Sequence, residues 1–166
     1  MLAMLVLLPF TSIAQTPDWM FALEGTYVGR CESPNAANDK IPIIRDIRMD
    51  GLRNGAENGF VVRYVMESEK GVSDWVEMWG WDEASGMVEM TTITGNQPAK
   101  YSWHVESSGA LTVLTRGGSE NNQAVIFRLK LQRLPGQLRM NRFVNDGSGA
   151  WEWRERYILE EYTSED

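Results

Sequence analysis

The chain has 166 residues, a formal net charge of -7 and a pI of about 4.8. This length fits one domain that buries a sizeable core without disulfide staples. An acidic balance without basic runs argues against nucleic acid and anionic membrane surfaces as partners, and we interpret the charge as favouring solubility. The only cysteine, Cys31, cannot form an internal disulfide, so we expect it to be a small buried hydrophobe.

Residues 1–14 form an apolar run that ends in small side chains at Ser12 and Ala14, a pattern typical of a secretory cleavage site. The run is shorter than the roughly 20 apolar residues that a membrane span needs. No Lys or Arg precedes it, which leaves room for a true start upstream, and a buried N-terminal helix is the alternative. We therefore predict a signal peptide over 1–14, one domain over 15–160 and an acidic tail over 161–166. The mature protein would be periplasmic or secreted, with no stable membrane insertion after signal removal.

Pro17–Leu23 has apolar residues on one side of a short helical turn, which suits a plug at one end of a barrel. Segments rich in β-branched and aromatic residues follow, with turn signals about every 8–12 residues. We predict an all-β fold, an antiparallel up-and-down β-barrel of about ten strands, because closure removes two exposed edges. A two-sheet sandwich is the alternative. The predicted strands are Gly25–Glu32, Ile41–Met49, Phe60–Glu67, the two arms of a hairpin over Asp74–Thr94, Tyr101–Ser107, Ala110–Arg116, Ala124–Gln132, Gln137–Val144 and Trp151–Leu159.

The hairpin over Asp74–Thr94 has three tryptophans and one glutamate at alternate positions of its first arm. Alternation puts Trp75, Glu77, Trp79 and Trp81 on one face of that arm. So many large aromatic rings on one face predict that the face looks into a large interior. The last strand repeats the pattern, with an inward face predicted for Trp151, Trp153, Glu155, Tyr157 and Leu159.

Three short motifs carry a family resemblance. The start of the first strand, Gly25-Thr26-Tyr27, resembles the Gly-x-Trp start of lipocalins and fatty-acid-binding proteins, with Tyr in place of Trp. The turn Gly80–Gly86 and the closing run Asp146–Tyr157 resemble a bacterial family of lipocalin-like, calycin-type barrels of unknown function. The resemblance implies a calycin-type barrel, and it names no ligand.

Nitrobindin-like haem barrels are a neighbouring family whose haem is held by a histidine near the last strands. Here the corresponding strand offers Glu155, Tyr157 and Ile158. The chain's one histidine, His104, lies mid-chain on a predicted outward face. We therefore expect no haem and no other cofactor.

Polar side chains on the aromatic faces are the candidate site. Glu77 and Glu155 would place two carboxylates in an aromatic interior, where Arg45 and Arg142 fall on faces that could neutralise them. In one interpretation these groups are structural ties in a packed barrel. In the other they orient a small ligand stacked on tryptophan rings. The predicted ligand-binding residues are Tyr64, Glu77, Trp79, Trp103, Phe127, Arg142, Trp153, Glu155 and Tyr157.

The predicted function is that of an exported lipocalin-like protein that binds a small hydrophobic or aromatic molecule inside its barrel. The first alternative is a packed structural or interaction barrel without a ligand. The second is a small enzyme with Glu77 or Glu155 as acid/base. A nucleophile triad would have to use His104, and one His with one Cys is too few for a zinc site.

Overall fold

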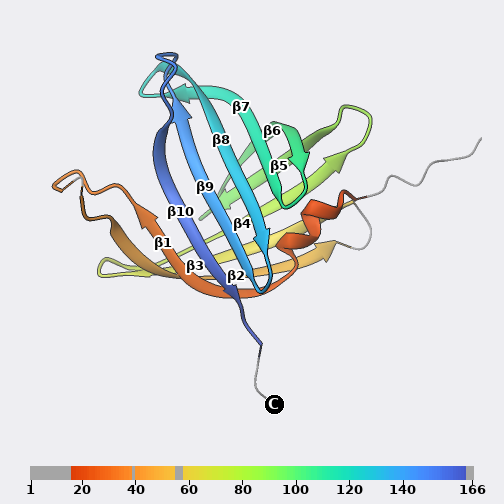
Figure 1. Cartoon of the computed structure of the whole chain (residues 1–166), viewed down its shortest axis with the longest axis horizontal. Helices are drawn as coiled ribbons and strands as arrows, with labels where there is room; N and C mark the ends of the chain where they lie inside the picture. Colours follow the sequence, from red (N-terminus) through yellow and green to blue (C-terminus); the bar gives the residue numbers. More distant parts are fainter. Residues whose placement is uncertain (1–15, 39, 55–57, 164–166) are drawn as a thin grey trace, which may run out of the picture.

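The computed structural model describes residues 16–38, 40–54 and 58–163. Within these residues ten antiparallel strands close into one barrel, in which each strand pairs with its neighbours in sequence and β1 pairs with β10 (Figure 1). Closure pairs both edge strands, which a two-sheet sandwich would leave open. The predicted fold class is confirmed. The strands are β1 (Gly25–Ser33), β2 (Ile43–Asn54), β3 (Gly59–Ser68), β4 (Gly71–Asp82), β5 (Met87–Thr94), β6 (Gln97–Ser108), β7 (Leu111–Glu120), β8 (Gln123–Leu134), β9 (Gln137–Asn145) and β10 (Glu152–Glu161).

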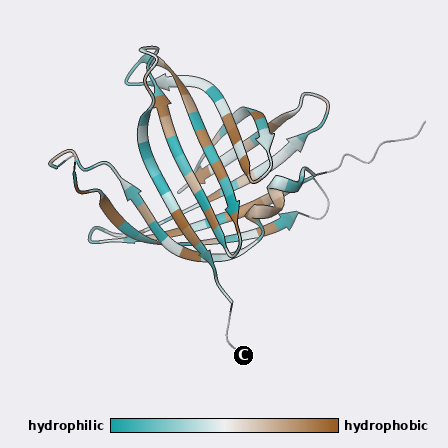
Figure 2. Ribbon diagram, in the orientation of Figure 1, coloured by the Kyte–Doolittle hydropathy of each residue, from teal (hydrophilic) through white to brown (hydrophobic). Residues whose placement is uncertain are grey.

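Side chains alternate between the barrel interior and solvent, as a pleated strand requires. On β3, Phe60, Val62 and Tyr64 are buried, whereas Val61 between the first two is 36% exposed. The same alternation is visible as hydrophilic and hydrophobic bands along β8, β9 and β10 (Figure 2). The register of β3 against β4 places Phe60 opposite Trp79. The inward face read from the sequence is therefore confirmed on these two strands.

A 3₁₀-helix, η1 (Asp18–Leu23), closes one end of the barrel, as predicted. Its inner side chains, among them Ala22 and Leu23, are buried. The hydroxyl of Tyr27 donates a hydrogen bond of 3.1 Å to the carbonyl of Ala22. Below the helix, a Cβ at Gly51 would lie 1.6 Å from the carbonyl oxygen of Leu23. Only glycine therefore lets β2 and the helix backbone approach this closely.

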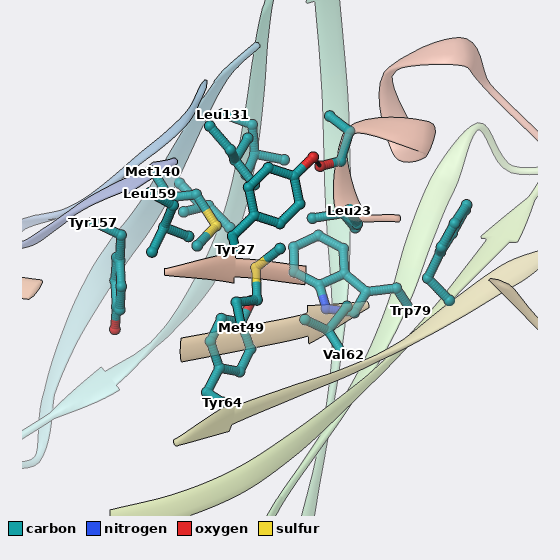
Figure 3. Close-up of a cluster of buried hydrophobic side chains, with 14 of the residues drawn as sticks. Leu23, Tyr27, Met49, Val62, Tyr64, Trp79, Leu131, Met140, Tyr157 and Leu159 are labelled. Atoms are coloured by element: carbon teal, nitrogen blue, oxygen red, sulfur yellow. Dashed lines mark hydrogen bonds between the residues drawn. The ribbon is translucent and has the colours of Figure 1, made fainter. Parts of the chain in front are cut away.

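The packed core lies beneath η1. Figure 3 shows Leu23 from the helix in one buried cluster with Met49 of β2, Trp79 of β4 and Leu131 of β8. Trp79 is only 2% exposed, and it is the largest of the fully buried side chains. A fully buried large apolar side chain contributes roughly 1.5–3 kcal/mol to stability. This half of the barrel is filled by side chains, as the packed-barrel alternative expects.

The two ends of the chain bear on the predicted boundaries. β10 continues to Glu161, and the backbone N–H of Tyr162 donates to the carbonyl of Thr26 at 2.8 Å. The acidic tail predicted over 161–166 therefore begins later than its predicted start. The signal peptide predicted over 1–14 lies outside the described residues. In the part of the chain that the structure describes, no helix has the length and apolarity to cross a membrane.

Candidate functional site

A cavity of about 640 Å³ lies in the barrel at the end away from η1. Alternate turns of an up-and-down barrel share an end. The cavity is lined by Trp75 near the start of β4, Thr94 at the end of β5 and Glu120 at the end of β7, so it belongs to the end with the β3–β4, β5–β6 and β7–β8 turns. The helix η1 packs at the other end. The volume falls in the range of roughly 300–1,000 Å³ that small-molecule sites occupy.

Aromatic rings form much of the cavity wall. Trp75 of β4 stacks on Tyr64 of β3, with ring centroids 4.9 Å apart and planes 11° from parallel. The Tyr64 ring lies 6.4 Å from that of Tyr157 on β10. Trp103 and Tyr101 of β6, Phe127 of β8 and Phe143 of β9 add to the aromatic lining. Such rings offer a ligand a large and rigid apolar contact area.

Arg142 of β9 joins two carboxylates at the inner side of the cavity. Its Nη2 donates to Oε1 of Glu77 at 2.9 Å, and its Nη1 donates to Oε2 of Glu155 at 3.4 Å. The second oxygen of Glu77 accepts a hydrogen bond from Nε1 of Trp79 at 3.1 Å. Burial alone would lower the pKa of Arg142, but the nearby acidic groups outweigh burial and raise it. The guanidinium therefore stays charged and ties three strands together.

Tyr157 extends this network. Its hydroxyl donates to Glu155 Oε2 at 2.7 Å. Burial raises the pKa of Tyr157 well above its ordinary value, so the hydroxyl keeps its proton and remains a donor. The buried Cys31 is a free thiol nearby, as predicted, and burial raises its pKa to about 11, with a further contribution from Glu155. This thiol is therefore protonated at neutral pH and a poor nucleophile.

Three further arginines reach the cavity, Arg116 on β7, Arg128 on β8 and Arg154 on β10. Nη2 of Arg154 pairs with Glu120 at 2.7 Å. Arg116 lies instead among aromatic rings, with its guanidinium carbon 4.0 Å from the ring centroid of Tyr101 and 4.1 Å from that of Phe127. The guanidinium carbon of Arg128 lies 3.6 Å from the ring centroid of Trp151. The cavity thus combines apolar walls with two ion-paired arginines and two arginines that contact rings.

Comparison with known proteins supports the architecture. Neither protein-family models nor curated protein sequences give a match to this chain. Among solved structures, the chain is similar to the crystal structure of Rv2717c from M. tuberculosis, with a TM-score of 0.60 and 10% sequence identity. The match covers 86% of this chain and 94% of that one. At this identity the likeness shows the fold alone.

The structure separates the predicted ligand-binding residues into three groups. Tyr64 and Trp79 are buried but do not line the cavity. The Tyr64 ring stacks against the Trp75 ring, and Trp79 belongs to the core. Trp153 also lies outside the cavity lining. The predicted residues that do line it are Glu77, Trp103, Phe127, Arg142, Glu155 and Tyr157. Arg45, the other cation considered for the interior, bonds to Ser33 instead.

The placement of Trp153 on the same face as Glu155 was wrong, because β10 contains a bulge. The register shifts between these two residues: Trp153 pairs with Phe143, and Glu155 pairs with Arg142. Since Phe143 directly follows Arg142, the extra residue Arg154 turns Trp153 to the opposite face. The guanidinium of Arg156 lies 5.3 Å from the Trp153 ring centroid, and it also pairs with Glu32 on the outer face of β1.

The predicted site missed other cavity residues, among them Trp75, Tyr101 and Arg116. Strand alternation already placed Trp75 and Tyr101 on the inward faces of Glu77 and Trp103. Arg116 carries the same signal, since it follows the buried Thr112 and Leu114 at every second position. His104 is exposed, as predicted. The described residues hold no group of three or more His, Cys, Asp or Glu that is suited to a metal ion.

Proposed function

We propose that this chain is an exported lipocalin-like protein that binds a small hydrophobic or aromatic molecule in the barrel. The observation that carries the proposal is the cavity of about 640 Å³ in the half of the barrel that the core does not fill. Small-molecule sites are typically concave, apolar and aromatic, with a few well-placed polar groups. This cavity has that composition, with rings from five strands around the Arg142 network.

The network around Arg142 favours binding over acid/base chemistry. Both oxygens of Glu77 accept hydrogen bonds, and the side chain is 1% exposed. One guanidinium holds this carboxylate and that of Glu155. A general base must be free to take a proton from a substrate within hydrogen-bond reach. Both oxygens of Glu77 are already occupied by hydrogen bonds, so the geometry fits a polar anchor for a ligand better than a catalytic pair.

Filling the cavity is expected to abolish binding. Thr92 of β5 lines the cavity and pairs with Glu77, so the indole of Thr92→Trp would occupy the space of the ligand. We expect affinity for the neutral fluorescent dye phenylnaphthylamine to fall about tenfold or more, a loss of at least about 1.4 kcal/mol. The measurement is a fluorescence titration, with thermal unfolding as the check that the variant folds.

The matched control is Thr91→Trp, which adds the same side chain one position earlier. Thr91 pairs with Met78, which is 41% exposed on the outer face of the barrel. This variant should bind the dye as the unmodified chain does. Equal dye binding by both variants, or none by the unmodified chain, would show that the cavity is not a ligand site.

Export is the second part of the proposal, and it is supported by the apolar run over 1–14 with small residues at Ser12 and Ala14. If the run is a signal peptide cleaved after Ala14, the exported chain begins at Gln15. Intact mass analysis of the chain from the periplasm and culture fluid of an expressing bacterium tests this. A chain that stays in the cytoplasm with Met1–Ala14 attached would contradict export and leave the binding proposal untouched.

A further inference from the structure

The guanidinium of Arg116 is enclosed by three aromatic rings. Its central carbon lies 4.0 Å from the ring centroid of Tyr101, 4.1 Å from that of Phe127 and 5.0 Å from that of Trp103. Its Nε is buried and has no hydrogen-bond partner among the described residues. Within the part of the chain that the structure describes, Nη1 donates only to the carbonyl of the adjacent Gly117, at 3.3 Å. The rings thus hold the guanidinium in place while most of its donors stay unused.

Four arginines line the cavity, and Arg116 alone among them is enclosed by three rings. Arg142 pairs with two carboxylates, and Arg154 pairs with Glu120. Neither Arg116 nor Arg128 has an ion pair within the described residues. Arg128, however, lies over the ring of Trp151, which is outside the cavity lining, whereas the three rings around Arg116 all line the cavity. The chain as a whole is acidic, with a formal charge of -7, so carboxylates are not scarce. Burial, followed by the nearby Arg142, lowers the pKa of Arg116, the direction expected for a cation without a counter-ion.

The backbone beside Arg116 leaves room for this arrangement. Gly118 follows on the same face of β7, and a Cβ there would lie 2.7 Å from Cε2 of Phe127 and 2.9 Å from Nη1 of Arg116. The space of a side chain at this position is therefore taken by the ring and the guanidinium. Aromatic contacts offset part of the cost of burying an unpaired cation. An anion bound in the cavity would offset the rest.

We propose that Arg116 is the anion-binding group of the cavity, and that the ligand is an aromatic or amphipathic molecule carrying a carboxylate, sulfonate or phosphate. The inference rests on the proposed function, because it specifies the ligand of the same cavity. The rings contact the apolar body of the molecule. The free N–H groups of the guanidinium pair with its anionic group, for which the planar fork of arginine is well suited.

Two dyes with the same ring system test the inference. Phenylnaphthylamine is neutral, and anilinonaphthalene sulfonate is the same molecule with an added sulfonate. We expect the unmodified chain to bind the sulfonate more tightly than the neutral dye, against the repulsion of its net negative charge. If the dyes compete with each other, and if Thr92→Trp weakens the binding of both, then both bind in the same cavity.

The decisive variant is Arg116→Gln, which removes the charge and keeps a polar side chain. Hydrogen bonds to charged groups contribute enough that we expect sulfonate affinity to fall about 10- to 100-fold, while neutral-dye affinity stays within about twofold. Arg139→Gln is the matched control, because it changes the net charge equally at an exposed position whose Nε bonds to Gln137. It should alter the affinity of neither dye.

The outcomes separate this inference from the proposed function. If Arg116→Gln binds both dyes as the unmodified chain does, the anion site is wrong and the cavity proposal stands. If the unmodified chain binds neither dye, the cavity proposal fails, and the anion site fails with it. If Arg116→Gln does not fold, the affinities of the unmodified chain for the two dyes still test the inference. A sulfonate dye that binds no more tightly than the neutral dye overturns it.

Discussion

Replacing Arg142 by leucine is expected to lower the free energy of unfolding by about 3–5 kcal/mol, because it leaves a buried carboxylate without a counter-ion. Glu77 is 1% exposed, and its Oε1 lies 2.9 Å from Nη2 of Arg142. After the substitution its remaining partner is the Nε1 of Trp79. Losing the contact with Glu155 adds less to the destabilisation, since the Glu155 side chain is 31% exposed and partly solvated. Chemical denaturation at neutral pH, followed by tryptophan fluorescence, measures the loss.

A control and a double variant show where the loss comes from. Arg139→Leu removes an exposed arginine of the same strand that bonds only to Gln137, and should change stability by less than about 0.5 kcal/mol. In the double variant Glu77→Leu with Arg142→Leu, apolar groups replace the buried pair, and most of the loss should be recovered. Equal losses in Arg142→Leu and Arg139→Leu would contradict a buried ion pair.

The alternation of inward and outward side chains made most of the fold predictable from the sequence. Side chains on a pleated strand alternate strictly between its two faces. The residues at every second position of β3, β4 and β8 therefore predicted the inward face of each strand from the sequence alone. The turn signals set the number of strands, and unpaired edges made closure the favoured topology. The same rule brought Glu77, Glu155 and Arg142 onto inward faces, and the structure shows all three in one network.

Alternation fails where the register changes. The bulge at Arg154 carries no local signal in the sequence, since it depends on how β9 and β10 pair over their whole length. One added residue is enough to turn Trp153 away from the cavity. A short motif shared with other barrels does not reveal such a shift either.

The sequence also does not show how far along the barrel the packing extends. Trp79 and Trp103 have the same inward pattern, yet one lies in the core beneath η1 and the other borders the cavity. Their depth follows from the stagger of the strands and from the position of the plug. Both are long-range properties, which a local pattern of residues does not encode.

Trp79→Ala is expected to destabilise the protein by about 3–5 kcal/mol, the usual cost of removing a large aromatic side chain from a core. The indole is 2% exposed, faces Phe60 across the β3–β4 pair and donates to Glu77, so the substitution leaves both a void and an unpaired carboxylate oxygen. Because Trp79 does not line the cavity, dye affinity of the folded variant should stay within about twofold of the unmodified value.

The control for this substitution is Met78→Ala, one position earlier on the outer face. Met78 is 41% exposed, so its truncation should cost less than about 1 kcal/mol. Denaturation curves and dye titrations on both variants then separate stability from binding. A Trp79→Ala variant that keeps its stability but loses the dye would make this indole part of the binding wall. A loss of stability with intact binding assigns it to the packed half of the barrel, which supports the cavity without entering it.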